Sequence, residues 1–318
     1  MSEKDRDVRP GRYDDTPLEA APDATRGHFA LLAGETLSGG LKRVLVGEIV
    51  TARDALADPA IGREEAIHRV RRRLKRARSL LAVLDEVPGA DREGRVTLLR
   101  DTARLLSGAR DADVVAREAR RILARAEGAT VAAAATMVER LESEQAAAHG
   151  RVPPLDEVAA RLRAGEANVR SLPDRFEAGR LLAAAIVEAH RRGRRDWRSL
   201  GEGLDIETLH DWRKRVKQRR HLSALVPIAT SVTTPALQRD LGDLGEILGE
   251  EHDLWLLQDR MEADGGLLRP REGRDSVVEL IARRRRRLAK KALELGEELY
   301  GVRTRDVDAA LEGLREVW

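Results

Sequence analysis

The sequence carries one cationic segment twice. HRVRRRLKRAR at 68–78 and HDWRKRVKQRR at 210–220 both begin with histidine, and the first contains seven basic residues and no acidic one. A repeated segment constrains the fold strongly, because each copy must be buried and exposed in the same way. The formal net charge is +3, from 58 Lys and Arg against 55 Asp and Glu. Any cationic function therefore comes from local sorting of charge rather than from the total.

The chain also matches itself elsewhere at the offset that aligns His68 with His210. The matched pairs within the segment are Arg71 with Arg213, Arg73 with Arg215, Lys75 with Lys217, Arg78 with Arg220, Leu80 with Leu222 and Ala82 with Ala224. Downstream, Asp101 meets Asp243, and LLSGARD at 105–111 meets ILGEEHD at 247–253 without a gap. Two matched blocks at one offset indicate internal duplication. We expect two helical halves, at 26–150 and 172–318, joined by a segment at 151–171 whose residues 155–164 form a short connecting helix.

The pattern of apolar residues predicts an all-α fold. Apolar residues recur at helical spacing from Phe29 onward, and Pro and Gly interrupt them at intervals. Aromatics make up 3% of the chain and charged residues 36%, a mixture typical of long amphipathic helices rather than strands. The sequence predicts helix N-caps at Asp205 and at Thr234, which precedes Pro235. Residues 1–25 are polar and without period, so we expect a disordered tail there.

Each basic segment, read as a helix, sorts its residues onto two faces. We call the cationic faces the first and second basic strips. The first strip has His68, Arg71, Arg72 and Lys75, with Arg78 at its edge; the second has His210, Arg213, Lys214 and Lys217, with Arg220 at its edge. Ser79 and His221 project to the same two faces. The opposite faces carry Val70, Leu74, Ala77, Leu81 and Leu84 in one copy and Trp212, Val216 and Val226 in the other. Arg219 and Ser223 are expected to weaken the second apolar stripe.

The lack of acidic partners indicates a function for these strips. A solvated helix face usually places acids four residues from its cations, yet the second segment contains only Asp211 and the first none. Like charges at this spacing destabilise a helix. The missing counter-charge must come either from acidic side chains elsewhere in the fold or from an anionic ligand. Asp111 and Asp253, which end the downstream blocks, are expected to orient basic residues.

Several classes of protein are disfavoured by what the sequence lacks. There is no cysteine, and the histidines show neither HxxH nor HExxH spacing, so we expect no metal site. The chain has no P-loop and no convincing DxD pair, which argues against an enzyme acting on phosphates and against a cofactor. No run of eighteen apolar residues and no signal peptide occurs, so we expect a cytoplasmic protein without membrane contact.

The duplicated histidine and basic helix, with an aspartate block downstream of each, resembles the CHAD family, the conserved-histidine α-helical domain. The resemblance extends from about residue 28 to Trp318. It implies two antiparallel four-helix bundles related by a pseudo-two-fold axis, around a basic central channel. It marks as binding residues His68, Arg71, Lys75, Arg76 and Arg78 with His210, Arg213, Lys214, Lys217 and Arg220. Gln218, His221 and His252 depart from the family pattern, and no ExExK segment precedes the domain, so we expect a standalone member.

The family is associated with inorganic polyphosphate, and the residues agree with such a ligand. Polyphosphate is a flexible polyanion without bases, which Arg and Lys bind by charge-assisted hydrogen bonds and counterion release. We therefore expect a protein that binds polyphosphate without changing it chemically. Other polyanions are expected as further ligands of the same residues, and we expect the protein to associate with polyphosphate granules. The alternative is a nucleic-acid-associated helical protein, although two Phe, two Tyr and four Trp supply few stacking aromatics. The third hypothesis is a phosphohydrolase or phosphotransferase that acts on polyphosphate.

Overall fold

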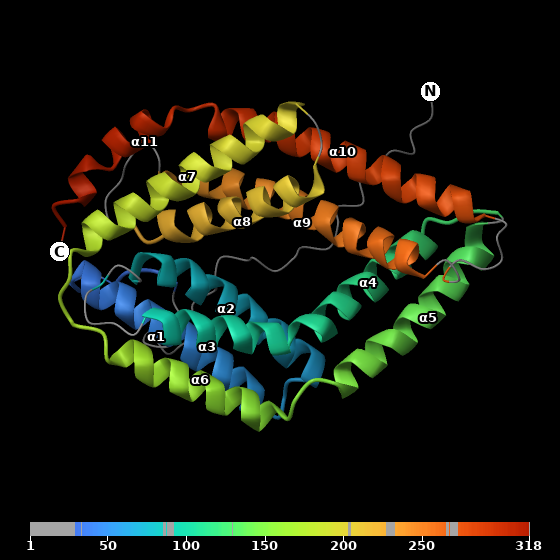
Figure 1. The fold of residues 1–318 in the computed structure, drawn as a ribbon, viewed down its shortest axis with the longest axis horizontal. Coiled ribbons are helices and arrows are strands. Elements are labelled where there is room, and N and C mark those ends of the chain that lie inside the picture. The colour runs from blue at the N-terminus through green and yellow to red at the C-terminus, as the bar shows by residue number, and fades with distance from the viewer. Residues whose placement is uncertain are drawn as a thin grey trace.

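The protein is helical throughout the part that the structure describes (Figure 1). This computed structural model describes residues 29–32, 34–84, 87, 92–128, 130–202, 205–226, 233–264, 267 and 273–317. Within them lie eleven α-helices, one 3₁₀ turn at Glu312–Leu314 and no strand. The helices are α1 (Leu37–Ala57), α2 (Arg63–Leu84), α3 (Arg92–Leu105), α4 (Ser107–Leu123), α5 (Thr130–Gly150), α6 (Leu155–Arg170), α7 (Ala178–Glu202), α8 (Ile206–Ser223), α9 (Pro235–Ala263), α10 (Arg274–Tyr300) and α11 (Thr304–Ala310). The predicted all-α class is confirmed; the predicted tail at 1–25 and Trp318 lie outside the described residues.

Side-chain caps begin α8 and α9 where the sequence predicted them. The Asp205 carboxylate accepts a hydrogen bond from the Thr208 amide at 2.8 Å. The Thr234 hydroxyl accepts one from the Leu237 amide at 3.2 Å, with Pro235 in the first turn. Both bonds satisfy amides that the helix itself leaves without acceptors. The start of the second basic segment is thereby fixed.

The buried apolar side chains of the described residues form three clusters. The first joins α1, α2, α3 and α6 with the start of α7 and the C-terminal residues. The second joins α4 and α5 with the C-terminal part of α9 and the N-terminal part of α10. The third lies among α7, α8, the first half of α9 and the end of α10. In Figure 1, α4 and α5 accordingly run away from α1–α3 to meet α9 and α10. Residues 26–150 therefore do not pack only on themselves.

The segment expected to connect the halves has a larger role in the structure. The predicted short helix at 155–164 is α6, which extends to Arg170 and packs on α1 and α3. Val158, Leu162 and Val169 along α6 are fully buried in the first cluster. Their separations correspond to about one and two helical turns, so they lie on one face of the helix. The helix therefore contributes to the first core.

The two predicted apolar stripes are buried, except that Val226 lies beyond the end of α8 and is partly buried. On α2, Val70, Leu74 and Ala77 are fully buried. On α8, Arg219, expected to weaken the stripe, is itself buried: its Nη1 donates to the Leu299 carbonyl at 2.9 Å, and its guanidinium lies 5.2 Å from the Tyr300 ring centroid. Its cationic group thus has polar and aromatic partners inside the core. None of the helices described is both long and apolar enough to cross a membrane.

Candidate functional site

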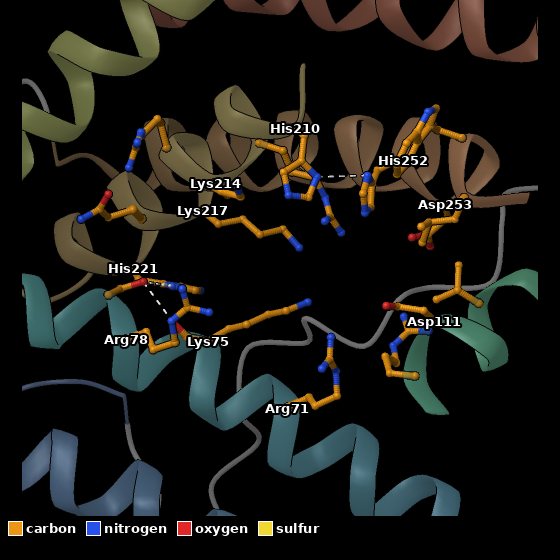
Figure 2. Close-up of a pocket in the computed structure, with 18 residues that line it drawn as sticks. Arg71, Lys75, Arg78, Asp111, His210, Lys214, Lys217, His221, His252 and Asp253 are labelled. Atoms are coloured by element: carbon orange, nitrogen blue, oxygen red, sulfur yellow. Dashed lines mark hydrogen bonds between the residues drawn. The ribbon is translucent and has the colours of Figure 1, made fainter. Parts of the chain in front are cut away.

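A cavity opens between α2 and α8, and it is bordered by α4 and α9 (Figure 2). We call it the α2–α8 cavity. Its volume is ≈ 590 Å³, and it is lined by Arg71, Lys75, Arg78, Ser79, Arg110, Asp111, Val114, His210, Arg213, Lys214, Arg215, Lys217, Gln218, His221, His252, Asp253, Trp255 and Leu256. The apolar stripes of α2 and α8 pack inward against different cores, so the basic strips are left facing one another across this space. Local helix periodicity thus positions the cations.

The structure brings the two predicted strips together, but their predicted binding residues are divided between two spaces. Seven predicted residues line the α2–α8 cavity: Arg71, Lys75, Arg78, His210, Arg213, Lys214 and Lys217. The other four, His68, Arg72, Arg76 and Arg220, line an adjoining pocket of ≈ 120 Å³. Arg71, Lys75, Arg213 and Lys217 border both spaces. These four side chains therefore stand where the two spaces meet.

Cations dominate the walls of the α2–α8 cavity. In the part of the chain that the structure describes, eight Arg and Lys side chains line it, against two aspartates. Lys75 and Lys217 reach into it from opposite helices (Figure 2). The pKa of Lys75 is lowered well below its usual value, first by the loss of bulk water around it and then by the charges of Lys217, Arg213, Arg71 and Arg110. The side chain remains accessible to water inside the cavity while protein surrounds it. Such a site favours an anion over further cations.

The arginines are held in place without being fully satisfied. Arg71 Nη1 donates to the Ala103 carbonyl at 3.0 Å, which anchors the guanidinium to α3. Its Nε–H is buried and donates to no acceptor in the described part of the chain, and the same is true of Arg215 Nε. Buried donors without acceptors cost stability, and a bound anion would relieve that cost. Lys214 differs, because Asp211 pairs with it at 2.8 Å.

Burial and neighbouring cations lower the pKa values of two histidines of the cavity, His210 and His252. His210 and His252 approach to 3.2 Å between their Nδ1 atoms, so one ring donates and the other accepts. Burial, followed by nearby cations, lowers the pKa of His210, and burial followed by Arg213 lowers the pKa of His252 to about 3. Burial and Arg110 also lower the pKa of His68. A neutral imidazole still offers one N–H to an anion.

Positions related by the sequence repeat meet across the cavity. Ser79 and His221, 142 residues apart, form a hydrogen bond of 2.9 Å between Oγ and Nδ1. Asp111 and Asp253, which the same offset aligns, lie opposite one another on α4 and α9 (Figure 2). Asp253 Oδ2 accepts from Arg117 Nη2 at 2.8 Å, so it holds a basic residue as the sequence suggested. Burial raises the pKa of Asp111, which accepts no hydrogen bond from the described residues.

Several residues at the margins of the cavity were not predicted from the sequence. Arg110 lines it from α4, and Arg100 and Arg104 on α3 border a further pocket with Arg71, Lys75 and Arg78. Their spacing of four residues along α3 puts both on one face, which is the only signal that could have indicated them. Glu64, Asp113 and His149, distant in sequence, place their ligand atoms within 4.8 Å of one another. Glu64 and Asp113 also line a pocket with His68. His149 Nε2 and Asp113 Oδ1 are 2.7 Å apart there.

The chain belongs to the CHAD domain family, whose sequence model matches residues 50–262. Among solved structures, it is similar to the crystal structure of the CHAD domain from the plant Ricinus communis, with 18% sequence identity and a TM-score of 0.56. The match covers 92% of this chain and 98% of that one, and at this identity it shows a shared fold. No curated protein matches the chain. The family resemblance stated from the sequence is therefore confirmed.

Proposed function

We propose that this CHAD protein binds inorganic polyphosphate in the α2–α8 cavity and does not chemically change it. The observation that carries the proposal is that eight Arg and Lys side chains, from both strips and their neighbours, converge on one space. Among the described residues, two carboxylates line the same space. A chain of phosphates offers many oxygens but no hydrogen-bond donors at neutral pH, which suits Arg and Lys walls. Association with polyphosphate granules in the cytoplasm is part of the same proposal.

The proposal includes two halves related by duplication, each contributing one strip and the helices of a four-helix bundle. The hydrogen bond between Ser79 and His221 supports this, because residues at equivalent positions contact one another next to a two-fold axis. Lys75 and Lys217, another equivalent pair, also act on each other electrostatically. The two strips then bind one shared ligand instead of two separate ones.

The test removes two cations from each strip separately. Arg71→Ala with Lys75→Ala, and Arg213→Ala with Lys217→Ala, are compared with Arg69→Ala with Lys290→Ala. The control residues are exposed and do not line the cavities described. Each charge-assisted contact contributes about 1.5–3 kcal/mol, so either strip variant should lose affinity roughly a hundredfold or more. The slope of log affinity against log salt should also become shallower, because fewer counterions are released.

Affinity, salt slope and melting temperature are measured for each variant. The control should bind as the wild type does. Loss of the fold with unchanged binding by the folded fraction would mean that the strips are structural and the proposal is wrong. An effect of only one strip would reject the shared ligand while leaving polyphosphate as the ligand. Release of phosphate from polyphosphate during the titration would reject the non-enzymatic part.

Nucleic acid is the second candidate, because the same cations attract any polyanion. Competition between polyphosphate and duplex DNA at several salt concentrations separates the two. We expect polyphosphate to displace DNA at every concentration, because Trp255 is the one Trp, Tyr or Phe among the described residues that line the cavity. A single-stranded nucleic acid stacks successive bases on several such rings, and sequence readers of duplex DNA place an element in a groove. Tighter binding of DNA at physiological salt would favour the alternative.

A further inference from the structure

The α2–α8 cavity is not uniformly cationic, and its two ends differ in chemistry. Beyond the tips of Lys75 and Lys217 lie His252, Asp111 and Asp253 (Figure 2). Val114, three residues after Asp111 on α4, lines the same cavity, as does Trp255 near Asp253 on α9. Residues at a spacing of three share a helix face. The end at Asp111 and Asp253 therefore adds carboxylates and apolar and aromatic surface to the cations of the cavity.

The carboxylates need an explanation in a site for a polyanion. Asp253 has a partner, since Arg117 donates to it at 2.8 Å. Asp111 accepts no hydrogen bond from the described residues; the charges of Arg71 and Arg110 act on it without such a bond. A bare phosphate chain brings acceptors and no donor at neutral pH, so it would leave the Asp111 carboxylate without a hydrogen-bond donor. A ligand with hydroxyl or amino donors would instead be bound there.

The aromatic surface restricts the ligand further. Trp255 stacks on His252, with ring centroids 5.5 Å apart and planes inclined by 24°. The His252 ring is itself backed by His210 at 4.6 Å. Trp255 is partly exposed and Leu256 beside it also lines the cavity, so an indole and an aliphatic side chain form a surface for a flat ring. Stacking on such a surface is typical of nucleobase binding and tolerates different bases.

From this arrangement we propose that the cavity takes a nucleoside polyphosphate. Its base lies against Trp255 and Leu256, its ribose hydroxyls donate to Asp111, and its phosphates lie among Lys75, Lys217 and the arginines. The volume of ≈ 590 Å³ is in the range of small-molecule sites. This inference rests on the proposed phosphate binding of the same cavity, and it adds a nucleoside subsite to it.

The experiment compares adenosine triphosphate with tripolyphosphate, which has the same number of phosphorus atoms and more negative charge. Both are titrated calorimetrically into the full-length protein without divalent cations, together with long-chain polyphosphate. We expect the wild-type protein to bind adenosine triphosphate at least as tightly as tripolyphosphate, because stacking and the hydroxyl contacts offset its lower charge. The change Trp255→Leu should weaken adenosine triphosphate binding roughly tenfold and leave tripolyphosphate within about twofold.

A second variant guards against misfolding of the first. Asp111→Ala removes a negative charge, so tripolyphosphate should bind more tightly, while adenosine triphosphate loses a hydrogen-bond acceptor and gains less. Circular dichroism and melting temperature confirm that both variants fold. The inference is wrong if adenosine triphosphate binds more weakly than tripolyphosphate in the wild-type protein and the ratio of the two affinities is the same in both variants. If neither compound nor long-chain polyphosphate binds, the proposed function fails as well, so the two failures are distinguishable.

Discussion

Lys75 shows how a single residue links ligand binding to stability. Its ammonium faces Lys217, Arg213, Arg71 and Arg110, and its pKa in the folded protein lies well below the ordinary value of 10.5. Among the described residues that act on it, these cations come from α8, α2 and α4, while Asp111 from α4 is a neighbouring carboxylate. A lysine with a lowered pKa binds its proton less tightly in the folded state than in the unfolded chain. Its charge therefore costs stability until an anion arrives.

This cost predicts that Lys75→Met raises the melting temperature of the free protein. The sign follows from linkage: the cost is fully present below the pKa of the folded state and disappears as the pH rises to 10.5, where the unfolded chain also loses the proton. The gain should amount to a few degrees at pH 7 and shrink toward pH 10.5. Thermal melts across this range measure it, with Lys290→Met as the control, since the Lys290 side chain is 80% exposed. A lower melting temperature for Lys75→Met at pH 7 would contradict the prediction.

Helix packing decides which elements can carry the site. α10 packs on α7 and α9, and its side chains share the third cluster with those of α8, which carries the second strip. A Cβ at Gly296 of α10 would lie 2.7 Å from Trp197 Cδ1 and 2.8 Å from Trp212 Cζ2, so only glycine lets these rings approach. In contrast, a Cβ at Gly47 in α1 would meet nothing within 4 Å. The two glycines offer a matched pair of substitutions in helix interiors.

We expect Gly296→Ala and Gly47→Ala to change stability in opposite directions. Overpacking against two indole rings should destabilise the first variant by about 1–3 kcal/mol. The second should gain about 0.5–1 kcal/mol, because alanine loses less backbone entropy in a helix. Urea denaturation monitored by circular dichroism gives both free energies of unfolding. Equal effects would mean that the rings relax easily around α10 and do not fix it.

The elements that the sequence predicted are those with a local physical signal. The caps Asp205 and Thr234 depend on residues within one turn, and the strips depend on helix periodicity. Two features required the tertiary structure. Arg219 is buried because Tyr300 and the end of α10 supply its partners, about eighty positions further along the chain. The packing of α6 on α1 and α3 likewise could not be read from a segment that shows only amphipathic spacing.

At the scale of the whole molecule, the division of the core explains why the cavity has two walls of different origin. The first cluster supports α2, and the third supports α8. The second cluster joins α4 and α5 to α9 and α10, so it connects the N-terminal and C-terminal parts of the chain. α2 also packs directly on α7 and α8. The repeat predicted two halves, but which helices each half shares with the other depends on contacts between distant segments, and the sequence alone does not show these.

The shared cluster predicts that the molecule unfolds in one cooperative transition. All four tryptophans of the sequence, Trp197, Trp212, Trp255 and Trp318, belong to the C-terminal part, so their fluorescence reports that part, whereas far-ultraviolet circular dichroism reports every helix. Met137 of α5 and Leu257 of α9 are buried in the same cluster. If α9 and α10 unfold, the apolar faces of α4 and α5 are exposed to water, so we expect α4 and α5 to unfold with them. The two signals should therefore give the same urea midpoint. Tripolyphosphate at a hundred times its dissociation constant should raise the free energy of unfolding by about 2.7 kcal/mol in both signals. Separate midpoints, or a ligand effect on fluorescence alone, would show that the C-terminal part folds and binds by itself, and the shared core would then not couple the two walls of the cavity.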